Sequence, residues 1–188
     1  MILHNLGSTF NGTDSLLQQH YYEQSDSLFQ DLDNWENRTR LWLDWAIYYI
    51  DYPKMYQKAD SLLNFCLAYG QANNDQNLLV NAHYLKGYLF QKQFNTSADT
   101  THFNVAIQQL KKSLEFSQDE SYRTYQMLGK VFQGSWAEDI DESHADSAIY
   151  YYKQALIGAR KEGGIRTMAN ISEELAYLYS YNNGLHQD

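Results

Sequence analysis

Cysteine and proline are nearly absent from this chain, since each occurs once in 188 residues. A single cysteine, Cys66, excludes an intrachain disulfide and a cluster of thiolate metal ligands, and it leaves the redox compartment open. The single proline and the hydrophobic content of 44% argue against a disordered or collagen-like chain. The composition therefore favours an ordinary globular protein.

Long apolar runs and an excess of basic charge are also lacking. No stretch approaches the roughly 18 apolar residues that cross a bilayer, and the first residues lack a basic segment followed by an apolar core. We therefore expect a soluble protein, cytoplasmic, or periplasmic if a signal sequence has been removed. The formal net charge of −9 disfavours nucleic acid and anionic membranes as partners of this segment.

Residue patterns typical of catalytic and metal sites are missing as well. The six histidines are scattered, none in a His-Glu-x-x-His spacing, and the acidic clusters lack the alternation of a calcium loop. No Gly-x-Ser-x-Gly, phosphate-loop or dinucleotide-binding pattern occurs. Cys66 lies among leucines on an apolar helix face, so we expect a buried filler and not a nucleophile. We expect no enzyme, no cofactor and no bound metal.

What the chain does contain is an internal repeat. The segment AHYLKGYLF recurs 42 residues later as TYQMLGKVF, so Gly87 corresponds to Gly129, and a phenylalanine follows each glycine three residues on. A small residue, Ala106 or Ala148, comes 19 residues after each glycine. Apolar positions recur at helical spacing around both alanines. Each unit is therefore predicted to hold two helices.

Two weaker copies and a second signature extend the repeat. Ala46 in LWLDWAIYY and Ala176 in ISEELAYLY take the place of the glycine. Ser25, Ala59 and Ala145 are each followed by Asp-Ser and then by an apolar run. Because Asp and Ser side chains can accept hydrogen bonds from free backbone N–H groups, we interpret each of these as a possible helix start.

These small residues resemble the tetratricopeptide repeat, a pair of antiparallel helices of about 34 residues. The resemblance covers roughly residues 38–181 and implies that the small residue on each first helix lets the second pack closely. It implies an all-α solenoid of about three helix pairs with additional N- and C-terminal helices, forming a single domain over 1–188. An irregular segment at 1–12 and a polar tail at 184–188 are expected to flank it.

The repeat departs from the family pattern in three respects, one of which is Lys86 at a position that is usually apolar. About seven extra residues separate the paired helices, and the proline that often closes a unit is absent. This chain is similar to divergent repeats of bacterial signalling proteins. The expected helices are 13–33, 38–51 paired with 55–71, 77–92 with 101–117, 120–134 with 143–161, and 165–182.

In the resembled family the first helices of the pairs line a concave groove that receives a peptide. The resemblance implies twelve groove residues: Arg40, Leu43, Ile47, Tyr84, Tyr88, Gln91, Arg123, Gln126, Lys130, Glu173, Tyr177 and Tyr181. Tyrosine and arginine are enriched at binding hot spots, although these tyrosines could equally fill contacts between repeats. Arg123 and Lys130 could face an acidic group of the ligand. The basic and asparagine clamp of chaperone-binding members is not reproduced.

We therefore expect a module that binds a protein or peptide, in the manner of a sensory or scaffolding region of a bacterial regulator. Two alternatives stay open. The chain could bind a small ligand, or act as an enzyme, through a pocket between helices around Tyr84, Arg123 and Glu173. It could also be a self-assembling structural module, forming a homo-oligomer through its last helix.

Overall fold

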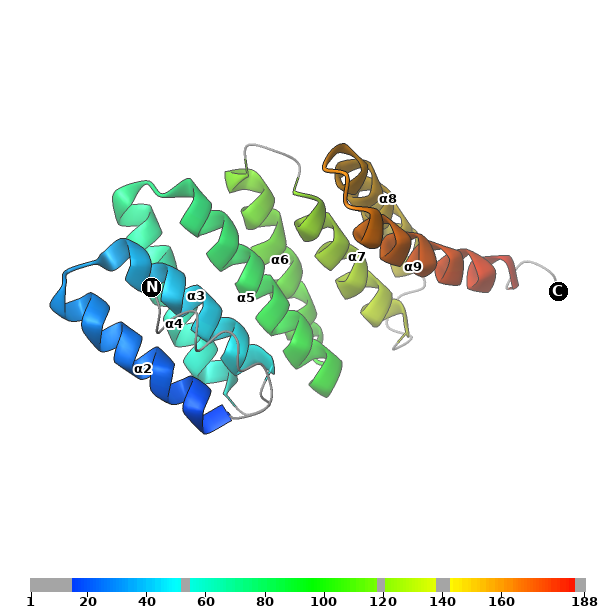
Figure 1. Ribbon diagram of the computed structural model, residues 1–188. Coiled ribbons are helices and arrows are strands. Elements are labelled where there is room, and N and C mark those ends of the chain that lie inside the picture. The colour runs from blue at the N-terminus through cyan, green and yellow to red at the C-terminus, as the bar shows by residue number, and fades with distance from the viewer. Residues whose placement is uncertain (1–14, 52–54, 118–120, 138–142, 185–188) are drawn as a thin grey trace. The chain divides into compact units, whose positions relative to one another are not determined.

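The computed structural model describes residues 15–51, 55–117, 121–137 and 143–184, which form eight α-helices and no strand (Figure 1). The prediction of an all-α protein is confirmed. None of the described helices is long and apolar enough to cross a membrane. The expected irregular segment 1–12 and residues 185–188 of the expected tail lie outside the described residues. The helices are α2 Ser15–Asp31, α3 Trp35–Asp51, α4 Tyr56–Asn73, α5 Gln76–Ser97, α6 Thr100–Phe116, α7 Tyr122–Ala137, α8 His144–Lys161 and α9 Ile165–Gly184.

Every expected helix is present, but α5 and α7 run farther than the sequence indicated. α5 continues to Ser97, five residues beyond the expected end, because its last turns bury Phe94 and contain no helix breaker. The helix ends at Ala98, which adopts a left-handed φ of 52° and donates from its N–H to the Phe94 carbonyl. Asp99 then caps α6 by accepting a 2.8 Å hydrogen bond from the Thr101 N–H. The extra residues before α6 therefore lengthen a helix.

The repeated small-Asp-Ser signature lies in the first turn of α4 and of α8, as predicted, but the copy at Ser25 does not mark a helix start, and the capping residues of α4 and α8 make no side-chain cap hydrogen bond. Ser25 lies well inside α2, Ala59 lies in the first turn of α4, and Ala145 is the second residue of α8. The Ser25 hydroxyl donates to the Tyr21 carbonyl one turn earlier and caps nothing. All three small residues are buried instead. Their role is to allow close helix packing.

The chain divides into two compact units, Met1–Leu85 and Lys86–Asp188, with the boundary inside α5. In the first unit α3 packs against both α2 and α4. Trp42, Cys66, Leu78 and Ala82 form a buried cluster there. Burial raises the pKa of the Cys66 thiol to about 12, so the group stays protonated. Cys66 is the buried filler that the sequence predicted.

An ion pair between two helices stabilises the first unit further. Arg38 on α3 donates from Nε to Asp26 Oδ1 on α2 at 2.7 Å, and the Trp42 indole N–H donates to the same oxygen at 2.8 Å. The guanidinium carbon lies 4.9 Å from the ring centroid of Trp35 and 4.8 Å from that of Trp42. The two rings shield this pair from water, which strengthens it over an exposed pair.

In the second unit α7 packs against α6 and α8, and α8 packs against α9. The repeat glycines lie where helices come closest. A Cβ atom on Gly87 of α5 would lie 2.4 Å from Leu110 Cγ of α6, and one on Gly129 of α7 would lie 2.8 Å from the Tyr152 ring of α8. Both distances are too short for real atoms. The predicted close-packing role of the two glycines is confirmed.

The alanines that take the place of the glycine in the two other copies differ in burial. Ala46, in the first unit, is fully buried. Ala176 is exposed, because among the described residues no helix follows α9 and covers it. The expected packing role of Ala176 therefore stays a prediction.

Two glycines of α7 allow a matched test of close packing. Gly129→Ala and Gly134→Ala gain the same helix propensity, but only the first adds a Cβ against a ring; the second meets Asn95 Oδ1 at 3.4 Å, an ordinary contact. We expect Gly134→Ala to be stabilised by about 0.5–1 kcal/mol. Gly129→Ala should be less stable than Gly134→Ala by about 1–3 kcal/mol. Urea unfolding measures both; equal midpoints would contradict the packing role.

Candidate functional site

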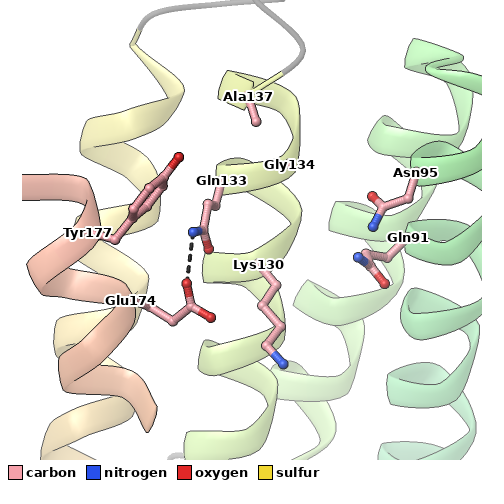
Figure 2. Close-up of a pocket in the computed structure, with 8 residues that line it drawn as sticks. All are labelled: Gln91, Asn95, Lys130, Gln133, Gly134, Ala137, Glu174 and Tyr177. Carbon is pink, nitrogen blue, oxygen red and sulfur yellow. Dashed lines mark hydrogen bonds between the residues drawn. The ribbon is translucent and has the colours of Figure 1, made fainter. Parts of the chain in front are cut away.

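The second unit contains an open depression of about 470 Å³ bordered by α5, α7 and α9, which we name the α7 hollow. Figure 2 shows α7 in the middle, with side chains of α5 on one side and of α9 on the other. Six of its eight lining residues carry polar side chains or a tyrosine ring. The lining residues are Gln91 and Asn95 from α5, Lys130, Gln133, Gly134 and Ala137 from α7, and Glu174 and Tyr177 from α9.

The floor of the α7 hollow is low because two small residues follow each other on one face of α7. Gly134 and Ala137 lie three residues apart and carry at most one methyl group. Unlike Gly129, Gly134 is not required by packing, since a Cβ there would meet only ordinary contacts at 3.4 Å and beyond. The space above Gly134 is therefore available to a ligand.

A chain of hydrogen bonds joins the core to one wall of the α7 hollow. The hydroxyl of Tyr152, fully buried on α8, donates to Gln133 Oε1 on α7. Gln133 Nε2 in turn donates to Glu174 Oε2 on α9 at 2.9 Å, as the dashed line in Figure 2 marks. The amide of Gln133 is thus held at both ends. It fixes the position of the Glu174 carboxylate.

Burial keeps the phenol of Tyr152 protonated. Loss of solvation raises the pKa of its phenol far above the ordinary value, and the nearby negative charge of Glu174 raises it further. Tyr152 is therefore a neutral hydrogen-bond donor throughout the physiological range. Its direction of donation, towards Gln133 and so towards Glu174, is fixed.

Several polar groups of the α7 hollow have no partner within the described residues. The side chains of Gln91, Asn95 and Lys130 make neither a hydrogen bond nor an ion pair with that part of the chain. Glu174 is half-buried, yet no lysine or arginine of the described ranges pairs with it. Amide and charged groups without partners are available to bind another molecule.

Aromatic rings continue the α9 wall of the α7 hollow. Tyr177 packs against Trp136 with centroids 6.3 Å apart and against Tyr181 at 5.8 Å, while Trp136 meets Tyr181 edge-on at 5.3 Å and 85°. Tyr177 is nevertheless 49% exposed and Tyr181 55%. Contacts with its two neighbours hold the Tyr177 ring in place, and about half of its surface remains open to a ligand.

A smaller depression of about 270 Å³ lies in the first unit between α3 and the start of α5. Its charged groups already have partners: Arg40 pairs with Glu36 at 2.7 Å, and Asp75 accepts from the Leu78 N–H at 3.0 Å as a helix cap. It therefore offers fewer available groups than the α7 hollow. Its lining residues are Glu36, Thr39, Arg40, Leu43, Asp75, Asn77, Leu78 and Asn81.

The structure brings some of the twelve expected groove residues together. Gln91, Lys130 and Tyr177 line the α7 hollow, and Arg40 and Leu43 line the smaller depression. The other seven line neither of these two; they are Ile47, Tyr84, Tyr88, Arg123, Gln126, Glu173 and Tyr181. The groove as a whole stays a prediction.

The pocket around Tyr84, Arg123 and Glu173 also stays a prediction. Tyr84 belongs to the first unit, and Arg123 and Glu173 belong to the second. Arg123 is exposed, and its guanidinium lies 5.9 Å from the ring of the adjacent Tyr122. No group of three or more histidine, cysteine, aspartate or glutamate residues suited to a metal occurs in the described part of the chain.

Five lining residues of the α7 hollow were missed: Asn95, Gln133, Gly134, Ala137 and Glu174. The sequence predicts that the two helices end at residues 92 and 134. Asn95 and Ala137 lie beyond these ends, so the predicted groove surface stops about one turn short of them. A signal for Gln133 was present, because the glutamine after the repeat phenylalanine recurs at Gln91 and Gln133. Helical spacing places Gly134 one turn after Lys130 and Glu174 one turn before Tyr177.

Comparisons of this chain with protein-family models, with curated proteins and with solved structures find no match.

The buried phenol of Tyr152 predicts a loss of stability at high pH. Below the ordinary pKa of about 10 the phenol is neutral in both states; above it the unfolded chain ionises while the folded protein, with its raised pKa, does not. The free energy of unfolding should therefore fall by up to about 1.4 kcal/mol per pH unit from this residue. Urea unfolding between pH 8 and 11 should show a shallower decline for Tyr152→Phe.

The matched control is Tyr150→Phe, on the same helix, whose ring is 56% exposed. This variant should follow the wild-type decline. At pH 8, Tyr152→Phe should also be less stable by about 1 kcal/mol, because Gln133 loses its donor. An equally steep alkaline decline in wild type and Tyr152→Phe would contradict the buried, neutral phenol.

Proposed function

We propose that this protein is a peptide-binding module and that an extended segment of a partner protein lies in the α7 hollow. The observation that carries the proposal is the set of polar side chains facing the hollow without partners in the described chain. Gln91 and Asn95 present amide donors and acceptors from one wall, and Lys130 presents an ammonium group from the floor. Amide side chains can pair with the free N–H and C=O groups of an extended main chain.

The dimensions of the α7 hollow support a chain-like ligand. Its volume of about 470 Å³ falls within the usual range of binding sites. It is open rather than enclosed, so an extended segment does not have to be threaded into it. The low floor at Gly134 and Ala137 leaves room for the main chain along α7.

We further propose that the helices form tetratricopeptide-like pairs, with α5 and α6 as one pair and α7 and α8 as the next. The repeated contact supports this arrangement, since Gly87 meets Leu110 and Gly129 meets Tyr152 at positions that are both 42 residues apart. The lining supports it too, because α5, α7 and α9 would be the first helices of successive pairs. A scaffolding or sensory role in a bacterial regulator is a proposal from the sequence resemblance alone.

The peptide-binding proposal predicts that filling the α7 hollow abolishes binding. Random peptides displayed on phage are selected against the protein, and Kd values of synthetic copies are measured by fluorescence anisotropy. Gly134→Leu and Ala137→Leu add bulk to the floor, so we expect each to raise Kd about tenfold or more. Circular dichroism melts check that both variants fold.

Ala169→Leu provides the matched control, because Ala169 is an exposed alanine of α9 that does not line the hollow. This substitution should leave Kd unchanged. Failure to select any peptide above background would overturn the proposal. So would Kd values for the two floor variants that equal that of Ala169→Leu.

A further inference from the structure

The carboxylate of Glu174 is held in place by one hydrogen bond, which uses only part of its capacity to accept hydrogen bonds. Its Oε2 accepts from Gln133, whereas Oε1 has no hydrogen-bond partner in the described part of the chain. A carboxylate can accept about four hydrogen bonds, so most of its capacity remains. Figure 2 shows the second oxygen pointing away from Gln133 into the hollow. A negatively charged acceptor is therefore presented to any ligand in the hollow.

The anchoring of Glu174 is rigid for a side chain at a surface. Gln133, which holds it, is itself held by the hydroxyl of Tyr152 in the core. A ligand that pairs with Glu174 therefore does not have to order this side chain on binding, which lowers the entropic cost of the contact. Because Glu174 is half-buried, its charge is less screened by water than the charge of a fully exposed carboxylate.

Tyr177 lies one turn after Glu174 on the same face of α9, and both line the hollow. The face of a phenol ring carries negative potential and attracts cations within about 6 Å of its centroid. Trp136 and Tyr181 hold this ring by edge and tilted contacts, while Tyr177 as a whole residue remains 49% exposed. A fixed carboxylate one helical turn from a half-exposed tyrosine, both lining the same hollow, is a suitable pair of contacts for a cation.

Lys130 is the one cation among the residues that line the hollow, and it does not neutralise Glu174. No ion pair joins the two side chains. Figure 2 shows the Lys130 side chain extending towards the opposite end of the hollow from Tyr177. The end lined by Glu174 and Tyr177 is therefore acidic and aromatic. The sequence alone left open an acidic ligand group that faces Lys130 and Arg123.

We propose that the Glu174–Tyr177 end of the α7 hollow receives a basic side chain, lysine or arginine, of the bound peptide. The carboxylate accepts a charge-assisted hydrogen bond, and the ring face of Tyr177 covers the cation or its aliphatic stem. This inference rests on the proposed peptide-binding function and specifies the chemistry of its ligand.

The probes are four pools of N-acetylated, C-amidated nonapeptides. Their central residue is fixed as lysine, arginine, glutamate or alanine, and the other positions are mixed. Capped ends remove the terminal charges, so the central side chain sets the difference between pools. We expect the lysine and arginine pools to bind about tenfold more tightly than the alanine and glutamate pools, as expected for a charge-assisted hydrogen bond.

Substitutions at the two contacts should change this preference selectively. Glu174→Gln keeps an oxygen for Gln133 but removes the charge, so affinity for the basic pools should fall about tenfold with no change for the alanine pool. Glu115→Gln, an exposed carboxylate of α6 outside the hollow, is the control for a general charge effect. The preference for basic pools persisting in Glu174→Gln would overturn the inference.

Two substitutions of Tyr177 test whether its aromatic ring contacts the basic side chain of the peptide. Tyr177→Phe keeps the ring face and should retain the preference for basic pools, whereas Tyr177→Leu should weaken their binding several-fold. Tyr179→Leu is the matched control, because Tyr179 is an exposed tyrosine of the same helix that does not line the hollow. If Tyr177→Leu and Tyr179→Leu lose the same affinity for the basic pools, the ring of Tyr177 does not contact the basic side chain.

Lys130→Gln distinguishes a basic ligand group in the hollow from an acidic one. Removal of this ammonium should leave binding of the basic pools unchanged or tighter, because a like charge leaves the hollow. If the glutamate pool binds best and Lys130→Gln weakens it, the inference is overturned while the peptide-binding function stands. If no pool binds, or if Gly134→Leu has no effect on any pool, both fail.

Discussion

The contact between Gly129 of α7 and the ring of Tyr152 on α8 is the constraint on which the second unit depends. The two helices approach so closely that a Cβ on Gly129 would lie 2.8 Å from the ring. This approach buries the ring completely and brings its hydroxyl to Gln133, one turn farther along α7. Gln133 then reaches Glu174 on α9. A packing contact between two helices thus positions a carboxylate on a third.

The preceding repeat shows what the hydroxyl contributes. Leu110 takes the place of Tyr152 and packs on Gly87 in the same way, but it has no polar atom. Gln91 takes the place of Gln133 and consequently has no buried donor to hold it. One glutamine is fixed and supports Glu174; the other keeps its amide available to the hollow. A single difference between two copies of a repeat therefore separates a supporting residue from a contact residue.

Much of the fold could be predicted from the sequence, because helical spacing and repeated small residues are local signals. The eight helices, the burial of Cys66 and the close approach at Gly87 and Gly129 all follow from them. Helix ends were less predictable, since the polar residues up to Ser97 neither favour nor break a helix strongly.

The candidate site was predictable only in part. Helical spacing brought Gln91, Lys130 and Tyr177 to one surface, as the α7 hollow has them. The hydrogen bond from Gln133 to Glu174 depends on the register of α9 against α7, and no local pattern encodes that register. From the sequence, Arg123 and Lys130 suggested an acidic ligand group as one possibility, because the position of Glu174 relative to Lys130 could not be predicted.

The two glycines of α7, five residues apart, differ in whether helix packing requires them. A glycine inside a helix costs about 1 kcal/mol relative to alanine. At Gly129 the burial of the Tyr152 ring offsets that cost, whereas at Gly134 no contact within the described chain requires the missing methyl group. Gly134 therefore weakens the helix without a packing reason, at the centre of a hollow lined by several polar groups without partners in the described chain, and this is consistent with the proposal that a ligand occupies the space.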